Sequence, residues 1–413
     1  MRILVSNVGS SSYKFSLLDM TGEEIVASGR VERIGDSPSP YAFTERGGKS
    51  GEGHLDAPDH LSAAQHVMRF LVGDMHGPAV LESLAALDGV GFKAVFAKGY
   101  TSSAIVDEDV MRGLEAYIPI LPVHNPAYIA SLRAFEDLAP SAPRVAVFET
   151  WFHETIPPHA AELGVPRSWV RDHAIRRYGF HGASHRYVAQ RTPELLRELG
   201  IGVGSADALR LVSCHLGGSS SLCAIRGGES MDTSMGFSAQ SGVLQGTRCG
   251  DMDPFVPLYM MKVGRLSLDE VERALMSDAG LAGISGAGGD MRDIFEAAEG
   301  GSADARLALD TYHYGVKKTI GAYAAALGGL DAIAFTGGIG ERSAESREAI
   351  CAGLEFLGVD IDTDRNVGLA GEGHVSTDAS PVSAVVVTAN EEIVVARETA
   401  RLIREAGPSR AAV

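Results

Sequence analysis

The sequence predicts an α/β protein made of two similarly folded domains, each a β-sheet flanked by helices. Three observations predict this. The chain has 413 residues, more than one ordinary hydrophobic core accommodates. Short apolar runs typical of strands alternate with longer runs of helical spacing. A pattern of apolar strand, glycine and three serines also occurs once in each half of the chain.

The repeated pattern predicts two β-hairpins. Residues 4–12 read LVSNVGSSS and residues 211–221 read LVSCHLGGSSS, and apolar runs follow at 15–18 and 222–225. Small-residue turns are common, so coincidence is the alternative. Because one hairpin opens each half of the chain, we favour an internal duplication.

The remaining elements follow from periodicity and from glycine and proline. Further strands are expected at 144–148, 332–335 and 384–387, and helices at about 306–327, 343–357 and 391–405. Residues 35–60, rich in glycine, proline and serine, predict a long loop. The boundary between the halves is expected near 152–158, where two prolines interrupt regular structure.

Composition limits the classes of function. The formal net charge of −17 argues against general binding of nucleic acid or of anionic membranes. The four cysteines form no C-x-x-C pair or zinc-spaced cluster, which favours a reduced, cytoplasmic protein. We expect no signal peptide and no transmembrane helix, because no apolar run approaches 18 residues.

Glycine-rich loops indicate phosphate binding. Glycine is abundant, at 49 residues, and four loops that appear to follow strands contain it, at 9–12, 217–221, 286–290 and 337–341. Such loops offer backbone N–H groups without side-chain bulk. One loop alone is weak evidence, but four together suggest a nucleotide, although no P-loop motif is present. Lys14 could reach a phosphate at the first loop, or could equally be a surface lysine.

Three polar clusters supply histidine or arginine within glycine, aromatic or proline contexts, at 124–126, 178–185 and 246–253. They could be simple turns, but these side chains are also those that neutralise a transferring phosphoryl group. Glu149 follows the 144–148 strand, where α/β sites usually lie. Glu391 could complement the dipole of the last helix, or could hold Mg²⁺ through water together with Asn7.

These residues match a known family. The chain resembles the acetate kinases, short-chain carboxylate kinases of the acetate and sugar kinase/actin superfamily, over nearly its whole length. The segments that carry the resemblance are NVGSSSYKF at 7–15, YGFHGASH at 178–185, SMGF at 234–237, GTRCGDMD at 246–253, FTGGIGE at 335–341 and TANEE at 388–392.

The resemblance implies a fold, an assembly and a reaction. Two actin-like, ribonuclease H-like domains would enclose a cleft, one spanning 1–153 plus 392–413 and binding the acid, the other spanning 154–391 and binding the nucleotide. It also implies a homodimer. The reaction is carboxylate + ATP ⇌ acyl phosphate + ADP, with Mg²⁺ or Mn²⁺ as the metal.

The roles that the resemblance implies for individual residues fall into four groups. Catalytic positions are Glu149, His181 and Arg248; metal positions are Asn7 and Glu391; acid-binding positions are Lys93, His124 and Phe180. Nucleotide positions are Lys14, His215, Leu216, Gly217, Gly218, Ser219, Asp290, Met291, Arg292, Gly338, Ile339, Gly340, Glu341 and Arg342.

The departures from the family pattern concentrate on the acid side. Lys93 stands where the family has an arginine that binds the carboxylate, and Phe92 and Phe96 stand where it has histidines. Glu149 replaces an aspartate and Gly218 an asparagine. The segment SAQS at 238–241 replaces Thr-Pro-Leu-Glu. Lysine cannot reproduce the two-pronged grip of arginine.

We therefore expect an acid kinase with acetate as its default substrate. One alternative is a kinase for propionate or for a larger or more polar acid. Another is a nucleotide-binding regulatory protein with a degenerate acid site, because a fold alone does not determine chemistry. The small-molecule acid and ATP are the expected partners, with no nucleic acid or membrane.

Overall fold

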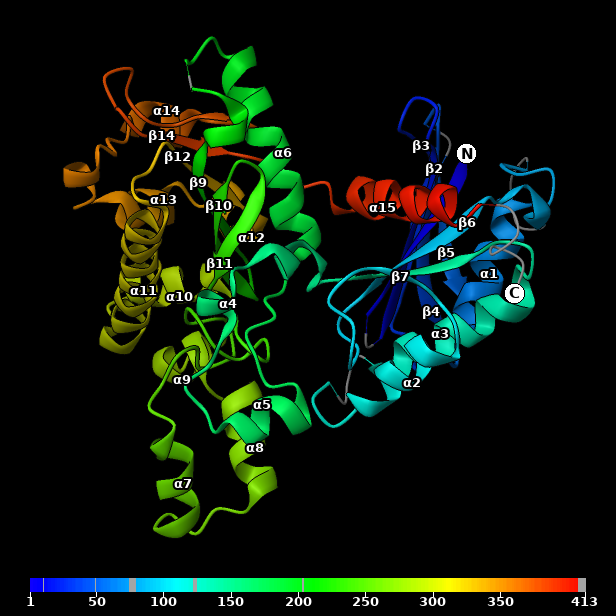
Figure 1. The fold of residues 1–413 in the computed structure, drawn as a ribbon, viewed down its shortest axis with the longest axis horizontal. Coiled ribbons are helices and arrows are strands. Elements are labelled where there is room, and N and C mark those ends of the chain that lie inside the picture. Colours follow the sequence, from blue (N-terminus) through cyan, green and yellow to red (C-terminus); the bar gives the residue numbers. More distant parts are fainter. Residues whose placement is uncertain (10, 49, 74–78, 122–124, 203, 408–413) are drawn as a thin grey trace. The chain divides into compact units, whose positions relative to one another are not determined.

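The computed structural model describes residues 1–413 except 10, 49, 74–78, 122–124, 203 and 408–413. It confirms the predicted α/β class with two sheets (Figure 1). The chain divides into two compact units. Unit 1 comprises 1–151 and 390–413, and unit 2 comprises 152–389.

Unit 1 contains a sheet with the order β5-β4-β3-β2-β1-β6-β8-β7. Its central strands β1, β6 and β8 are parallel, whereas β2 to β5 form an antiparallel meander that starts from β1. The strands are β1 (Arg2–Val8), β2 (Ser12–Asp19), β3 (Glu24–Glu32), β4 (Ser39–Glu45), β5 (Ser50–Leu55), β6 (Gly89–Ala94), β7 (Ala104–Ile105) and β8 (Arg144–Phe148).

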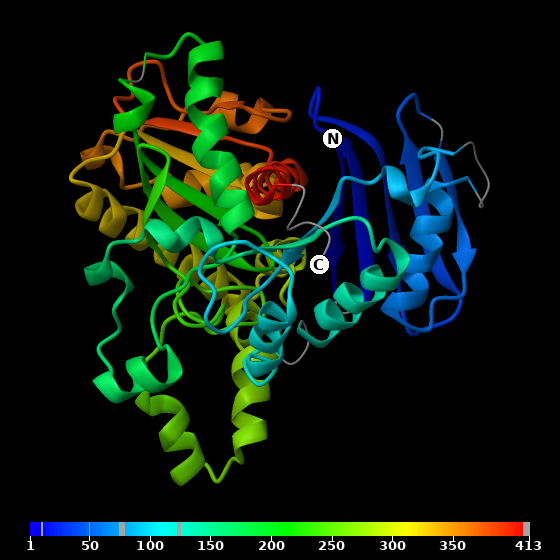
Figure 2. The ribbon, with the colours of Figure 1, turned by 45° about the vertical axis from the view of Figure 1, so that its right-hand side comes forward.

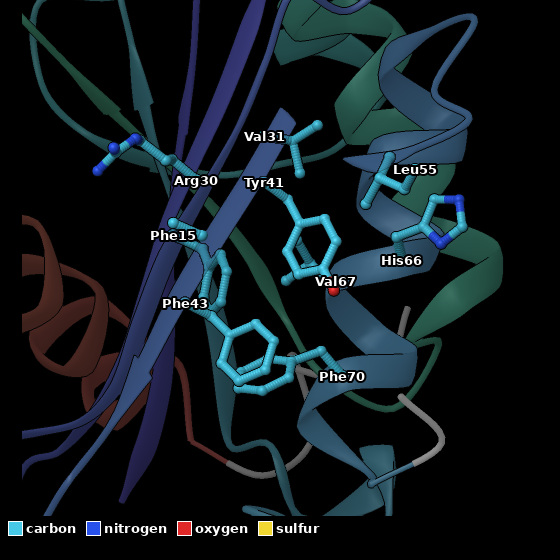
Figure 3. A pocket seen from close by; sticks show the side chains of 10 residues that line it. Phe15, Arg30, Val31, Tyr41, Phe43, Leu55, His66, Val67 and Phe70 are labelled. Carbon is cyan, nitrogen blue, oxygen red and sulfur yellow. The ribbon is translucent and has the colours of Figure 1, made fainter. Parts of the chain in front are cut away.

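Helices cover both faces of this sheet. On one face, the helices are α1 (His60–Leu71), α2 (Glu108–Ala116) and α3 (Asn125–Leu138), with a short 3₁₀ turn at Leu84–Ala86. The aromatic rings of Phe15 and Phe43 point from the strands toward Phe70 of α1 and extend the core to the outer strands (Figure 3).

The other face is covered by α15 (Glu391–Ala406), the last helix of the chain, which packs on β1, β6 and β8. Gly91 of β6 makes this close approach feasible. A Cβ placed on Gly91 would lie 2.2 Å from the hydroxyl oxygen of Thr399 on α15. The missing side chain therefore lets the helix lie directly on the strand and brings Glu391, at its start, to the sheet.

Unit 2 contains a sheet with the order β11-β10-β9-β12-β14-β13. The parallel strands are β9 (Arg210–Leu216), β12 (Ala332–Thr336) and β14 (Ser383–Val386). The antiparallel strands are β10 (Ser220–Arg226), β11 (Glu229–Thr233) and β13 (Gly373–His374).

The two sheets match strand for strand. The run β3-β2-β1-β6-β8-β7 has the same directions as β11-β10-β9-β12-β14-β13, and unit 1 adds β4 and β5 at one edge. Both predicted hairpins are present, as β1–β2 and β9–β10. The repeated sequence pattern therefore marks the first hairpin of two similarly built units.

The buried core of unit 2 centres on the long helix α11 (Ala303–Leu327), which packs on β9 and β10 (Figure 2). Its predicted inward residues Val316, Ile320, Tyr323 and Leu327 are buried. The other helices of this unit are α4 (Pro158–Ala161), α5 (Arg167–His173), α6 (Gly182–Glu198), α7 (Phe255–Lys262), α8 (Leu268–Ser277), α9 (Gly280–Ser285), α10 (Met291–Glu299), α12 (Gly337–Arg342), α13 (Ala344–Cys351) and α14 (Thr363–Gly368), with 3₁₀ turns at Trp151–Thr155, Ala206–Ala208 and Glu355–Leu357.

Three sequence-based expectations were wrong. Residues 35–60 are not one loop, because β4 and β5 form a hairpin there at the edge of the sheet. The helix expected at 343–357 is shorter, since α12 already begins at Gly337 and α13 ends at Cys351. The loop at 286–290 follows the helix α9 rather than a strand. Within the described residues, no helix has both the length and the apolarity to cross a membrane, as expected.

Candidate active site

In unit 1, the polar residues predicted from sequence gather at the carboxyl ends of the parallel strands. Asn7 lies near the end of β1, Lys93 near the end of β6, and Glu149 directly follows β8. Glu391 is the first residue of α15, whose N-cap is the side chain of Asn390. This edge of a parallel sheet is where α/β proteins usually bind ligands.

Lys93 lies between two carboxylates. Its Nζ is 3.1 Å from Oε1 of Glu149 and forms a second, closer ion pair with Oε2 of Glu391. Burial by itself lowers the pKa of the Lys93 ammonium, but the two carboxylates outweigh that effect and raise the pKa well above its usual range. Lys93 is therefore a charged ammonium that forms ion pairs with both of these carboxylates.

Unit 1 contains a polar pocket beside its first hairpin, β1–β2. It has a volume of about 390 Å³, and Asn7, Lys14, Arg30 and Glu392 contribute to its lining. Lys14 is paired in register with Asn7 on one side and with Arg30 on the other, so these polar residues form a row across three strands. His124, the third residue predicted from sequence to bind the acid, lies outside the described residues.

Unit 2 contains a larger pocket, of about 720 Å³, within the range usual for small-molecule sites. Most of the residues predicted from sequence to bind nucleotide line it. They come from three segments, and those in the lining are Gly217, Gly218, Asp290, Met291, Arg292, Gly338, Ile339 and Arg342. Gly289, which lies in the predicted glycine-rich loop at 286–290, also lines it, and the lining residues that were not predicted are Phe295, Glu299, Ser343 and Glu345.

The other predicted nucleotide residues of unit 2 are not among those that line this pocket. Glu341 accepts hydrogen bonds from the backbone N–H of Gly337 and the hydroxyl of Thr336, at 3.1 and 3.3 Å, so its carboxylate fixes the start of α12. His215 and Leu216 end β9, and Gly340 is buried within α12.

Arg248 is a partly buried cation held by neutral groups. Its Nη1 donates to the hydroxyl of Ser219 at 3.0 Å and to the amide oxygen of Gln245 at 3.2 Å. Gln245 is fully buried and is itself tied to the backbone oxygen of Ala239. Burial lowers the pKa of the Arg248 guanidinium. A partly buried guanidinium with neutral acceptors favours an incoming anion such as a phosphoryl group.

His181 occupies a strained position at the start of α6. Its backbone has φ 57°, in the left-handed region that non-glycine residues rarely adopt, and such strain clusters at functional sites. The ring of His181 stacks on that of His215, with centroids 4.1 Å apart. Its Nδ1 is 2.8 Å from the hydroxyl oxygen of Ser221 on β10.

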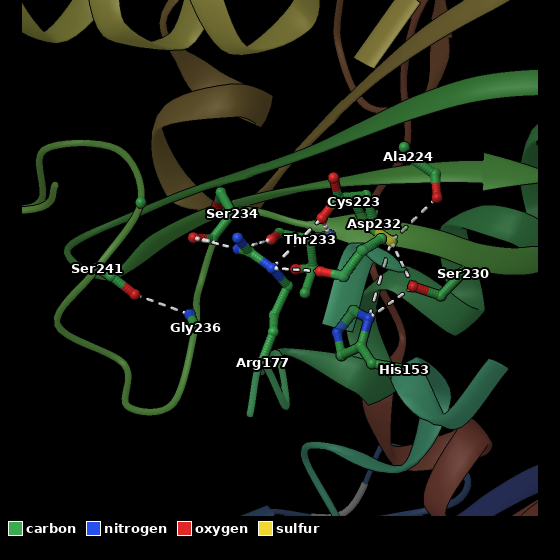
Figure 4. A network of polar contacts seen from close by, with 12 residues as sticks. His153, Arg177, Cys223, Ala224, Ser230, Asp232, Thr233, Ser234, Gly236 and Ser241 are labelled. Atoms are coloured by element: carbon green, nitrogen blue, oxygen red, sulfur yellow. Dashed lines mark hydrogen bonds and ion pairs between the residues drawn. The ribbon is translucent and has the colours of Figure 1, made fainter. Parts of the chain in front are cut away.

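The backbone before His181 is anchored by a separate network (Figure 4). His153 Nε2 donates to the carbonyl oxygen of Phe180 at 2.9 Å. Its Nδ1 accepts from the hydroxyl of Ser230 at 2.9 Å, a bond that Figure 4 shows. Burial lowers the pKa of His153 to about 4, so the ring is neutral and this assignment of protons is consistent. Arg177 holds the same segment through the backbone oxygen of Thr233.

Several contributors to these sites were not found from sequence. Gln245, Ser221 and His185 lie within the predicted segments or next to them, but only the fold shows which side chains they contact. Arg30 was not singled out from the sequence, and it lies in β3, a strand for which no prediction was made.

The donor chemistry of unit 1 suits a magnesium ion that relies on few protein ligands. Asn7 and Glu391 offer oxygen donors, and Mg²⁺ typically takes one or two carboxylates plus water and substrate phosphates. Within the described residues, no cluster of three or more histidine, cysteine or acidic side chains forms a complete metal cage. Any metal at Glu391 would compete with the Lys93 ammonium.

Comparisons with known proteins give matches over almost the whole chain. The model of the Acetokinase family matches residues 2–397. The chain is 43% identical over 403 residues to an acetate kinase of Clostridium botulinum strain Kyoto, covering 97% of this chain and 98% of that one. It is 41% identical to an acetate kinase of Shouchella clausii, covering 97% and 99%.

Two solved structures also match the chain over almost its whole length. A crystal structure of Porphyromonas gingivalis acetate kinase matches with a TM-score of 0.86 and 35% identity, covering 97% of this chain and 99% of that one. A propionate kinase from Francisella tularensis matches with a TM-score of 0.86 and 32% identity, over the same shares of the two chains.

Proposed function

The chain belongs to the Acetokinase family, and from that premise we propose that it transfers the γ-phosphoryl group of ATP reversibly to a short-chain carboxylate, with acetate as the default acceptor. The enzyme class is a phosphotransferase with a carboxyl acceptor. The observation that carries the proposal is the partly buried guanidinium of Arg248, which donates to the neutral hydroxyl of Ser219, the residue that follows Gly218 of the nucleotide-sized pocket.

On the phosphoryl side, Arg248 and His181 act on the transferring group. A carboxylate oxygen attacks the γ-phosphorus in line while the bond to the ADP oxygen breaks, and charge spreads over the equatorial oxygens. The guanidinium of Arg248 and the ring of His181 donate hydrogen bonds to those oxygens. The pocket lined by Gly217, Gly338 and Asp290 holds the nucleotide.

On the acid side, Lys93 orients the carboxylate, with Phe180 and His124 as further contacts. Lys93 already forms ion pairs with Glu149 and Glu391, so an incoming carboxylate competes with these two groups for one ammonium. A lysine also gives a point charge rather than a two-pronged grip. Weak capture of acetate, or selection of a longer acid such as propionate, follows from this arrangement.

Mg²⁺, or Mn²⁺ in its place, would be held by Glu391 and Asn7 and by the nucleotide phosphates. When bound, it would supply positive charge that neutralises phosphate oxygens. Lys14 and Arg30 line a polar pocket with Asn7 and bring positive charge to the same face of the sheet.

We further propose that the enzyme is a homodimer. The helix α7 and the residues beside it expose large apolar side chains, with Phe255 at 71%, Tyr259 at 60% and Val263 at 59% exposure. The helix extends away from the sheet of its unit (Figures 1 and 2). Contiguous exposed apolar surface on this scale is characteristic of protein interfaces, and a second copy of the chain is the occupant that fits a homodimer.

We assign the enzyme to the cytoplasm. All four cysteines are free thiols, and Cys214, Cys223 and Cys351 are buried, which suits a reducing compartment.

A coupled assay for ADP over a panel of acids, with hydroxylamine trapping of acyl phosphate, tests the proposed activity. We expect ADP and a trapped acyl hydroxamate to form in equal amounts with acetate or propionate. Saturating Mg-ATP should also raise the melting temperature by several degrees, because it binds only the folded state. ATP binding without turnover on any acid would instead indicate a regulatory protein.

A further inference from the structure

A chain of hydrogen bonds runs from the interior of unit 2 to His181. Ser213 Oγ is 2.8 Å from His185 Nδ1, His185 Nε2 is 2.8 Å from Ser221 Oγ, and Ser221 Oγ is 2.8 Å from His181 Nδ1. The members come from β9, β10 and the first turn of α6. Ser213, Ser221 and His185 are fully buried.

The shared serine couples the two rings. The Ser221 hydroxyl has one proton, so it can donate to only one of the two ring nitrogens that it bonds. At least one of His181 Nδ1 and His185 Nε2 therefore carries a proton. When the Ser221 proton lies between the two rings, the tautomer of the buried His185 ring sets the tautomer of the partly buried His181 ring.

His185 is neutral at physiological pH. Burial, followed by the nearby His153 and His215 rings, lowers its pKa well below the usual value. When the single proton of a neutral His185 lies on Nε2, that nitrogen donates to Ser221, and Ser221 can then donate to His181 Nδ1. In that arrangement the single proton of a neutral His181 lies on Nε2, the nitrogen that is not bonded to Ser221.

The opposite polarity would disable a neutral His181. Its proton would lie on Nδ1, and Nε2 would offer a lone pair to phosphoryl oxygens, which are themselves acceptors.

Resting on the proposed function, we propose that Ser221 and His185 are positioning residues that hold His181 as the Nε2–H tautomer, so that its ring donates to the transferring phosphoryl group. Neither residue contacts substrate; both act through His181. The serine–histidine chain is thus part of the catalytic apparatus rather than only packing between β9, β10 and α6.

The test compares Ser221→Ala with a matched control, Ser230→Ala. The control removes another buried serine–histidine bond, to His153, that does not touch His181 (Figure 4). Nitrogen-15 spectra of histidine-labelled full-length protein, at a pH where the rings are neutral, report which nitrogen of His181 is protonated. Turnover and the KM for ATP are measured on the same samples.

We expect Ser221→Ala to mix the His181 tautomers and to lower kcat about 10- to 100-fold, with little change in the KM for ATP, as for other histidine-orienting partners. Ser230→Ala should retain the tautomer and most of the kcat. His185→Gln, which keeps an N–H donor for Ser221, should be milder than His185→Leu.

An unchanged His181 tautomer in Ser221→Ala overturns the proposal, and so does a changed tautomer with normal kcat. If the wild type phosphorylates no acid while the tautomer still responds to Ser221→Ala, the proposed function fails and the hydrogen-bond chain stands. The spectroscopic readout thus separates the two failures.

Discussion

The cationic residues of the two units are held in opposite ways. In unit 1, Lys93 is neutralised by two carboxylates, Glu149 and Glu391. In unit 2, Arg248 is partly buried and held by a hydroxyl and an amide oxygen. The two sheets share the same order over six strands, so the difference comes from side chains rather than from topology. A cation whose partners are neutral can bind an anion directly. A cation that already forms ion pairs with carboxylates must first give up one of them.

Removing Arg248 should have the largest effect. Arg248→Ala is expected to lower kcat on the order of 10³-fold with a small change in the KM for ATP, because a guanidinium that stabilises transition-state charge is lost. Steady-state kinetics measure both constants. Arg292→Ala is the control, since Arg292 lines the nucleotide pocket but is exposed and paired with Asp290. A variant with normal kcat that only loses ATP affinity would contradict the assigned role.

Low pH should destabilise unit 2 through its buried histidines. Burial lowers the pKa of His153 from 6.5 to about 4, and that of His185 also falls well below 6.5. Because the folded-state pKa is depressed, the stability is present above pH 6.5 and is lost as the pH falls toward 4. For His153 alone the loss reaches roughly 3 kcal/mol by pH 4, because one pKa unit corresponds to about 1.4 kcal/mol and the folded-state ring is half protonated at that pH.

Urea unfolding followed between pH 7 and pH 4 measures this loss. His153→Gln, which keeps a donor for the Phe180 carbonyl, should flatten the dependence. A midpoint that stays constant over this range in the wild type would show that neither ring is held neutral by burial.

Removing the ammonium of unit 1 should strengthen metal binding. Lys93→Met leaves Glu149 and Glu391 without their shared cation, so we expect Mn²⁺ to bind about 10-fold more tightly in the absence of nucleotide, equivalent to about 1.4 kcal/mol. Isothermal titration calorimetry with Mn²⁺ measures this affinity directly. Lys98→Met, at an exposed position five residues away, is the control. Equal affinity in all three proteins would mean that Lys93 does not compete with a metal.

The parts of the fold that were predictable from sequence are those with a local signal. The strand at 144–148 and the helices at 306–327 and 391–405 have apolar spacing that matches their burial. The β4–β5 hairpin was missed because an edge strand is half-exposed and tolerates glycine and proline, so it resembles a loop. Gly337–Gly340 was assigned to a loop because glycine lowers helix propensity, yet tertiary packing starts α12 there.

The site was predictable as a set of segments but not as a set of contacts. The residues that line the nucleotide pocket were largely expected, because glycine-rich segments suit phosphate. The pairing of Lys93 with Glu391 joins residues 298 positions apart, and the Ser221 bond to His181 spans 40 positions. Such contacts arise only from the packing of α15 on β6 and of α6 beside β9.

The central claim is that the residues proposed to handle the phosphoryl group follow the family pattern, whereas those proposed to bind the acid depart from it. The most direct test titrates acetate, propionate and butyrate side by side on the wild type, Lys93→Arg and the control Lys98→Arg. Arginine restores two parallel hydrogen bonds to a carboxylate, and the loss of one is worth roughly 1.5–3 kcal/mol. We expect a wild-type kcat/KM that favours propionate or butyrate over acetate, and about 10- to 100-fold better acetate use in Lys93→Arg. Tight, acetate-selective kinetics in the wild type, unchanged by Lys93→Arg, would contradict it.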